Sequence, residues 1–241
     1  MQDDVRQGEP ARLAWRGGAM LYAPERVAEP GPALFDPAAY GEAAAPVAEG
    51  GRAAAWFVHG QAGAAVLRRY RRGGLMARLG RRSYLWLGEA RTRSFAEFRL
   101  MHAMWRQGLP VPRPLAAAYW RRGLACDAAI LVERIAGARP LASALDGPAC
   151  QAAALAIARM HRAGVRHADL NAHNVLLDPA GAAWLIDFDR GRAGPAPLGE
   201  AARRANLLRL RRSLAKLAGQ AGEQAWQRLD EAYRAAWQAG A

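Results

Sequence analysis

The sequence predicts an α+β fold with two lobes, a small antiparallel β-sheet lobe followed by a compact, mostly helical lobe. Short strand patterns separated by glycine turns dominate the first half of the chain, and long helical patterns dominate the second half. The order of elements lacks the strict strand–helix alternation of a doubly wound sheet. We place an N-terminal extension at 1–40, the sheet lobe with one helix at 41–135, and the helical lobe at 136–241.

Glycine and proline delimit the elements expected in the first lobe. Residues 11–23 read as a hairpin that turns at Gly17-Gly18, and Asp36-Pro37 is typical of the start of a short helix. Strands follow on both sides of Gly50-Gly51, and a further strand begins after a turn at 60–63. Residues 93–108 carry apolar side chains at a helical period, and the helix is expected to end at Gly108.

The second half of the sequence has fewer turn signals and longer helical patterns. The proline-rich segment 109–120 leads into strands around 127–135, and 147–164 reads as a strong helix that stops at Gly164. A loop and two strands follow between 165 and 189. The C-terminal segment reads as two amphipathic helices. Leu207, Leu210, Leu214 and Leu217 form one apolar stripe, for which we favour core packing over contact with a membrane.

Composition limits the classes of function. The chain has 241 residues, with 34 Lys and Arg against 21 Asp and Glu, which gives a net charge of +13. This charge favours anionic partners, although an Arg-rich codon bias also explains it. Lys216 is the only lysine, which excludes a Walker-type phosphate loop and Schiff-base chemistry at any upstream position. Cys126 and Cys150 are expected to be buried thiols, and no signal peptide or membrane-spanning run is evident, so we expect a soluble or peripheral protein.

The segment RHADLNAHNVLLD and the following IDFDRGR carry the chemistry. His167-x-Asp169-x-x-x-x-Asn174, followed by Asp187, has the order and spacing of the kinase catalytic residues. Phosphoryl transfer from ATP needs one carboxylate to accept the proton of the acceptor hydroxyl, a role predicted for Asp169. It also needs Mg²⁺ held by hard oxygen ligands, predicted to be Asn174 and Asp187. His167 is expected to be structural, and the alternative is that these residues only form turns.

The residues expected to contact ATP lie upstream of this segment. Arg68 falls where kinases carry a phosphate-contacting lysine, with Arg69 as its rival, and Glu97 on the following helix is the expected partner of that cation. Gly50 and Gly51 are expected in the loop over the phosphates, and Glu133 at the hinge where backbone groups meet adenine. Asp189 stands where protein kinases have glycine, and few residues remain after it to hold a peptide substrate. A small-molecule acceptor is therefore favoured.

Several blocks of the chain resemble one family of small-molecule kinases. VLRRYRRGGLMARL, YLWLGEARTRSFAEFRLM, GLPVPRPLAA, GVRHADLNAHNVLLD, WLIDFDRGR and NLLRLRRSLAKL are similar to the 3-deoxy-D-manno-octulosonic acid (Kdo) kinase family of lipopolysaccharide biosynthesis. The resemblance runs from about Phe35 to Lys216, and Ala53 departs from it at a position where a glycine is expected. It implies a protein-kinase-like fold and ATP-dependent phosphorylation of the 4-hydroxyl of Kdo on a Kdo-lipid A precursor.

The resemblance also implies a location and substrate contacts. Asn171 and His173 match the family pattern and are expected to face the sugar, while Arg190 and Arg192 are our candidates for binding a substrate carboxylate or phosphate. The enzyme would work as a peripheral protein on the cytoplasmic face of the Gram-negative inner membrane, where its arginine-rich segment 68–82 would meet anionic lipid. No nucleic-acid motif is present, and no protein partner is indicated.

Two alternatives remain. A lipopolysaccharide heptose kinase or an aminoglycoside-type phosphotransferase would share Asp169, Asn174 and Asp187 but would lack the RRYRRGGL and NLLRLRRSL blocks. A degenerate kinase that only binds a membrane or nucleic acid would have no physical need for the complete set of base and metal ligands. Transfer of phosphate to Kdo separates these alternatives from the main prediction.

Overall fold

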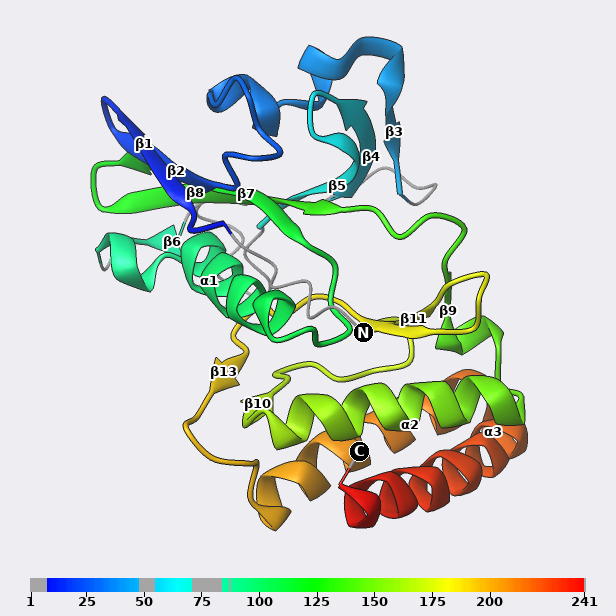
Figure 1. Ribbon diagram of the computed structural model, residues 1–241. Helices are drawn as coiled ribbons and strands as arrows, with labels where there is room; N and C mark the ends of the chain where they lie inside the picture. Colours follow the sequence, from blue (N-terminus) through cyan, green and yellow to red (C-terminus); the bar gives the residue numbers. More distant parts are fainter. Residues whose placement is uncertain (1–7, 48–54, 71–83, 87, 241) are drawn as a thin grey trace. The chain divides into compact units, whose positions relative to one another are not determined.

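The computed structural model describes residues 8–47, 55–70, 84–86 and 88–240 (Figure 1). The chain divides into two compact units, each with its own internal packing. The first consists of Met1–His102 and Arg113–Arg134, and the second of Ala103–Pro112 and Ile135–Ala241.

An eight-stranded sheet forms the first unit, in the order β1-β2-β7-β8-β5-β4-β3, with β6 also paired to β8. All of these pairs are antiparallel, as the sequence predicted. The strands β1 and β2, which lie in the predicted N-terminal extension, form one edge of this sheet. The strands are β1 (Ala11–Trp15), β2 (Gly18–Tyr22), β3 (Ala44–Pro46), β4 (Ala55–Gly60), β5 (Gly63–Arg69), β6 (Tyr84–Leu85), β7 (Pro114–Arg122) and β8 (Ala125–Glu133).

The hairpin turns agree with the glycine pattern, with one shift. Trp15 pairs with Gly18, so the first turn consists of Arg16 and Gly17 rather than Gly17 and Gly18. Gly18 instead begins β2, where an added Cβ would lie 2.4 Å from the carbonyl oxygen of Tyr119. The turn between β4 and β5 lies within 60–63 as predicted. The predicted turn at Gly50-Gly51 lies outside the described residues.

Helix α1 (Arg93–Arg106) lies between β6 and β7 in the chain and begins in the first unit. Its apolar positions Phe95, Phe98 and Met101 are buried, as the helical period predicted. Asp36 accepts a hydrogen bond from the N–H of Ala38 and thereby caps the short helix η2. The short 3₁₀ turns of this unit are η1 (Pro32–Phe35), η2 (Pro37–Ala43) and η4 (Glu89–Arg91).

Two long helices and several short strands form the second unit. Asp146 caps α2 (Gly147–Arg162) by accepting a hydrogen bond from the N–H of Ala149 at 2.8 Å. The alanine-rich face of α2 packs against α3. The remaining elements are β9 (Arg139–Pro140), η5 (Leu141–Ser143), β10 (Val165–Arg166), β11 (Val175–Leu177), β12 (Ala183–Leu185), β13 (Arg192–Ala193) and α3 (Glu200–Ala239).

Helix α3 breaks at Gly219, whose φ of 53° and ψ of −124° are not helical. The two halves run side by side in Figure 1 and correspond to the two predicted C-terminal helices. Gly222 permits the close return, because a Cβ there would lie 2.1 Å from the carbonyl oxygen of Leu214. The favoured core packing is confirmed for three of the four stripe leucines, which are buried, whereas Leu217 is exposed.

Both cysteines, Cys126 and Cys150, are buried thiols that form no disulfide, as expected. Among the described residues, no helix combines the length and the apolar character that crossing a membrane requires.

Candidate functional site

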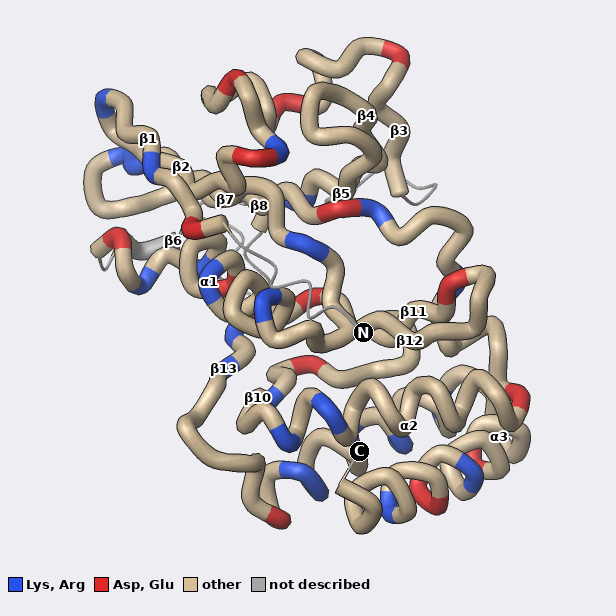
Figure 2. The backbone as a smooth tube through the Cα atoms, in the orientation of Figure 1, with Lys and Arg blue, Asp and Glu red and all other residues tan. Residues whose placement is uncertain are grey.

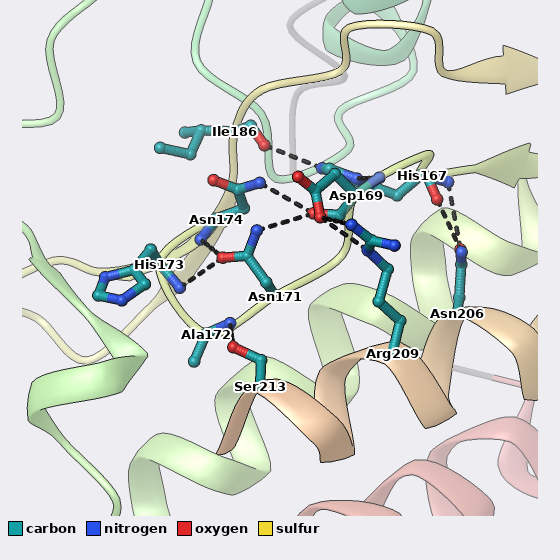
Figure 3. A network of polar contacts seen from close by, with 10 residues as sticks. All are labelled: His167, Asp169, Asn171, Ala172, His173, Asn174, Ile186, Asn206, Arg209 and Ser213. Atoms are coloured by element: carbon teal, nitrogen blue, oxygen red, sulfur yellow. Dashed lines mark hydrogen bonds and ion pairs between the residues drawn. The ribbon is translucent and has the colours of Figure 1, made fainter. Parts of the chain in front are cut away.

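The loop 167–174 connects β10 to β11 and is held by its own side chains (Figure 3). The amide oxygen of Asn171 accepts hydrogen bonds from the N–H groups of His173 and Asn174, at 2.9 and 3.2 Å. Its amide nitrogen donates to the carbonyl oxygen of Asp169 at 3.1 Å. Asn171 therefore has the turn-forming role that the sequence also allowed. The side chain of His173 is exposed.

His167 joins this loop to the end of β12. Its Nδ1 accepts a hydrogen bond from the N–H of Asp169 at 3.0 Å, which leaves the proton on Nε2 to donate to the carbonyl oxygen of Ile186 at 2.9 Å. Burial lowers the pKa of His167, so the ring stays neutral and keeps this tautomer near neutral pH. Its ring also packs 4.7 Å from the ring of Phe188. The expected structural role of His167 agrees with these contacts.

The register of two strands brings Asn174 and Asp187 to the same end of a hairpin. Val175 pairs with Leu185, and the carbonyl oxygen of Asn174 accepts a hydrogen bond from the N–H of Ile186 at 3.0 Å. Asp187 follows directly and has a positive φ of 62°. This conformation is uncommon for residues other than glycine, and it concentrates at functional sites.

The donor atoms of Asn174 and Asp187 suit a hard divalent cation. The amide nitrogen of Asn174 donates to the carbonyl oxygen of Asp169 at 2.9 Å, and its amide oxygen points the opposite way (Figure 3). Within the described ranges, no group of three His, Cys, Asp or Glu residues is placed to hold a metal by protein ligands alone. Mg²⁺ commonly takes one or two protein oxygens and completes its octahedron with substrate phosphates and water. The residues present therefore fit Mg²⁺ bound together with a nucleotide.

Asp169 forms an ion pair with Arg209 of α3. The Nε and Nη2 atoms of Arg209 lie 2.7 and 2.5 Å from Oδ1 of Asp169. Partial burial raises the pKa of Asp169, but the hydrogen bonds and charge of Arg209, together with Asn171 and His167, outweigh it and hold this pKa below its usual range. Asp169 is therefore a carboxylate at neutral pH, with half of its side chain open to solvent.

Two further side chains on the same face of α3 hold the loop backbone. Asn206 accepts a hydrogen bond from the N–H of His167 at 3.2 Å and donates to its carbonyl oxygen at 2.7 Å. The hydroxyl of Ser213 accepts from the N–H of Ala172 at 3.2 Å. With Arg209, these residues are spaced by three and four positions, so they share one helical face that points toward the loop (Figure 3).

Sequence reasoning missed this face of α3. Its signal lies in the NLLRLRRSL block, where Asn206, Arg209 and Ser213 recur at a helical period beside the leucine stripe. That period alone fits a solvated polar face equally well. Buried His161 extends the network, because its ring nitrogens lie 3.2 Å from Oδ1 of Asn206 and 2.9 Å from the hydroxyl of Tyr233.

In the first unit, Arg68 and Glu97 form the predicted ion pair. Nη2 of Arg68 lies 2.5 Å from Oε1 of Glu97, and the hydroxyl of Tyr70 donates to Oε2. Glu97 is buried, which excludes an exposed helix glutamate. Arg69 points elsewhere, because its guanidinium donates to the carbonyl oxygen of Phe35 at 2.8 Å. Arg68, not Arg69, is therefore the partner of Glu97.

The predicted phosphate loop and adenine hinge involve Gly50, Gly51 and Glu133. Gly50 and Gly51 lie outside the described residues. The carboxylate of Glu133 lies 3.1 Å from Arg26, and the N–H of Glu133 donates to the carbonyl oxygen of Arg113 at 2.8 Å. That N–H is thus already used within the sheet, and the adenine contact at Glu133 stays a prediction.

Arg192 lies on β13 directly opposite Arg166 of β10, a residue that sequence reasoning also missed. Both strands carry basic residues in Figure 2, and both arginines are exposed. Like charges placed directly opposite are unfavourable in a sheet. Within the part of the chain that the structure describes, neither forms an ion pair with an acid. Arg190, exposed in the preceding turn, has a positive φ of 61°.

Comparisons with known proteins agree with this chemistry. The model of the Lipopolysaccharide kinase (Kdo/WaaP) family matches residues 38–233. A 3-deoxy-D-manno-octulosonic acid kinase of Stenotrophomonas maltophilia (strain K279a) is 51% identical over 240 residues, covering 96% of this chain and 95% of the relative. The proteins of the same name from Xanthomonas campestris pv. campestris (strain B100) and Xylella fastidiosa (strain M12) are each 50% identical. These alignments cover 92% and 93% of both chains, respectively.

Proposed function

The chain belongs to the lipopolysaccharide kinase (Kdo/WaaP) family, and we propose that it phosphorylates the 4-hydroxyl of Kdo on a Kdo-lipid A precursor, with ATP as phosphate donor. The single observation that carries this proposal is the joint placement of Asp169, Asn174 and Asp187 around one loop and one hairpin end. The enzyme class, a phosphotransferase that acts on a hydroxyl in lipopolysaccharide biosynthesis, follows from the family and its relatives.

In the proposed reaction, the acceptor hydroxyl oxygen forms a bond to the γ-phosphorus of ATP as the bond from that phosphorus to the β-phosphate oxygen breaks. The hydroxyl proton passes to the carboxylate of Asp169, and ADP leaves. His167, Asn171 and Asn206 fix the backbone around Asp169, so the carboxylate is held for the incoming hydroxyl. When bound, Mg²⁺ would neutralise phosphate charge, and Asn174 and Asp187 would supply its protein oxygens.

We assign the phosphate-contacting cation to Arg68. The buried carboxylate of Glu97 and the Tyr70 ring, whose centroid lies 4.8 Å from the central guanidinium carbon, fix its orientation. A guanidinium is always charged and matches the geometry of phosphate oxygens, which makes arginine a workable replacement for lysine. Gly50 and Gly51 stay predictions for the phosphate loop, and Glu133 for the adenine hinge.

The two compact units support the assignment of a two-lobed, kinase-like fold. The antiparallel sheet with α1 is the counterpart proposed for the N-lobe at 41–135, and the part that contains α2 and α3 is the counterpart proposed for the C-lobe at 136–241. Residues 1–40 are proposed as the extension, with β1 and β2 joined to the edge of the sheet.

On the acceptor side, we assign anion binding to Arg192, with Arg190 and the newly identified Arg166. Arg166 and Arg192 are paired directly opposite across the two strands, where like charges are unfavourable, and a phosphate or carboxylate bound by both would offset that cost. His173 is retained as a candidate sugar contact because it is exposed on the same loop as Asp169. Asn171 would contact the sugar only in addition to its hydrogen bonds within the loop.

We further propose peripheral attachment to the cytoplasmic face of the inner membrane. The net charge of +13 supports it, since each basic group near an anionic surface contributes about 1 kcal/mol. Most of the arginine-rich segment at 68–82 lies outside the described residues, and the buried leucines of α3 are not available to lipid.

The proposed function is tested by incubating the purified protein with Mg-ATP and three separate acceptors. These are Kdo-lipid A, a heptosylated lipopolysaccharide core and an aminoglycoside. We expect one phosphate on Kdo, located at the 4-hydroxyl by phosphorus–proton correlation in the NMR spectrum. Phosphate on heptose or the aminoglycoside, with Kdo-lipid A unchanged, contradicts the proposal. Phosphate at another hydroxyl of Kdo contradicts only the assigned position.

A further inference from the structure

We infer that Arg209 binds the carboxylate of the acceptor sugar, so that one guanidinium bridges Asp169 and the substrate. This inference rests on the proposed function, because it takes the acceptor to be a sugar acid. It gives a role to the NLLRLRRSL block, which the catalytic residues of the generic kinase pattern leave unexplained.

The geometry of the ion pair leaves donors for a second anion. Both contacts of Arg209 fall on Oδ1 of Asp169, so this pair does not use Oδ2. The third guanidinium nitrogen, Nη1, points away from Asp169 (Figure 3). Arginine presents five N–H donors in a planar fork. The Nε and Nη2 edge of the guanidinium thus binds the carboxylate of Asp169, and Nη1 can donate to the carboxylate of an acceptor bound beside it.

The position of Arg209 is fixed by the fold rather than by the ion pair. On either side along the helix, Asn206 holds the backbone of His167 and Ser213 holds the N–H of Ala172. These neutral hydrogen bonds fix the face of α3 against the loop. The guanidinium therefore reaches Asp169 from a preorganised helix, which is the arrangement that a substrate-binding group requires.

The chemistry of the acceptor supplies the reason for a cation here. In a sugar acid of the Kdo type, the carboxyl group is attached at C2, two carbons from the 4-hydroxyl. A hydroxyl that contacts Oδ2 of Asp169 therefore brings the sugar carboxylate close to the same catalytic carboxylate. Two like charges at this separation repel. A guanidinium between them turns the repulsion into two charge-assisted hydrogen bonds.

This role also makes Arg209 a determinant of specificity. A heptose or an aminoglycoside has no carboxylate beside its acceptor hydroxyl, so it gains nothing from Arg209 at this position. The exposure of both Arg209 and Asp169 is consistent with substrate access to the pair. An exposed ion pair contributes little to folding, so stability alone does not account for this arrangement.

The test uses four combinations of enzyme and acceptor. The kcat/KM of wild type and Arg209→Gln is measured with detergent-dispersed Kdo-lipid A, and with the same acceptor after its sugar carboxylate is converted to the methylamide. For wild type, kcat/KM is expected to be about tenfold to hundredfold lower on the amide than on Kdo-lipid A, which is the range for one hydrogen bond to a charged group. For Arg209→Gln, conversion of the carboxylate to the methylamide is expected to lower kcat/KM by less than about threefold, because the interaction with the carboxylate is already absent.

Arg212→Gln is the matched control, because Arg212 is exposed on the same helix and has no contact with the loop among the described residues. It should show the selectivity of wild type. If Arg209→Gln turns over too slowly to measure, calorimetric binding of the two acceptors to this variant and to wild type gives the same comparison. If Arg209→Gln also displaces Asp169, the variant loses the same factor on Kdo-lipid A and on its amide. That factor cancels in the ratio of the two kcat/KM values.

An equal loss on the amide by wild type and Arg209→Gln overturns the assignment of Arg209 and leaves the proposed function standing. Absence of transfer by wild type to unmodified Kdo-lipid A, alongside transfer to another acceptor, instead overturns the proposed function and this inference with it.

Discussion

The two units each contain a carboxylate–guanidinium pair with N···O separations of 2.5 Å, yet the pairs differ in their surroundings. The side chain of Glu97 is 1% exposed and that of Arg68 is 24% exposed, whereas Asp169 and Arg209 are 51% and 47% exposed. Breaking a buried pair leaves a charge without compensation, while an exposed pair is screened by water. The first pair is therefore part of the fold, and the second is accessible from solvent.

The largest expected change in stability comes from the buried pair. Glu97→Ala should lower the free energy of unfolding by about 3 kcal/mol, the low end for breaking a buried pair, since Arg68 is partly exposed. Thermal unfolding should shift down by about 6–12 °C. Glu223→Ala, which breaks the exposed pair with Arg211, serves as control and should shift the midpoint far less. Equal shifts in the two variants contradict the contrast between buried and exposed pairs.

An intermediate effect is expected from the buried network behind the loop. Burial lowers the pKa of His161 to about 4, against about 6.5 when unfolded. Between these values the unfolded chain binds a proton that the native protein does not bind. Stability should therefore fall with decreasing pH, by up to about 1.4 kcal/mol per pH unit from this group. Urea unfolding at pH 7.5 and 5.5 measures this change.

The matched variant is His161→Gln, which retains polar side-chain atoms and does not titrate in this range. Its stability should depend less steeply on pH than that of wild type, with a residual slope from His167, whose pKa burial also lowers. The same slope in both proteins excludes His161 as the titrating group.

The smallest change in stability is expected at the exposed pair. Arg209→Gln should alter the free energy of unfolding by less than about 1 kcal/mol, because both partners are half exposed and screened by water. The midpoint of urea unfolding, with the slope unchanged, measures this quantity. A loss as large as that of Glu97→Ala would show that the pair holds the loop in place, contrary to the proposed contrast.

The residues that could be predicted from sequence are those whose spacing reflects local chemistry. Asp169, Asn174 and Asp187 lie close together along the chain, and Glu97 lies on a strongly periodic helix after the strand that carries Arg68. The antiparallel sheet, the helices α1 and α2, and the two-part α3 were predicted in the same way from turn glycines and apolar periods.

The residues that were missed depend on tertiary contacts between distant segments. Asn206 and Arg209 each contact the loop across about 40 positions of sequence, and a polar helix face does not reveal what it packs against. Arg166 and Arg192 meet across strands of two residues, which are too short to show a period. The hydrogen bonds of Asn171 also required the folded loop, because its position alone fits a turn or a substrate contact.

The most direct test of the account is single-turnover transfer from Mg-ATP to Kdo-lipid A by wild type and Asp169→Asn. The asparagine retains the size of the side chain but cannot accept the proton of the hydroxyl. We predict that phosphorylated Kdo forms with wild type and that its rate falls by about 10²–10⁴-fold in the variant, with ATP affinity largely unchanged. A variant rate within threefold of wild type would contradict the role of Asp169.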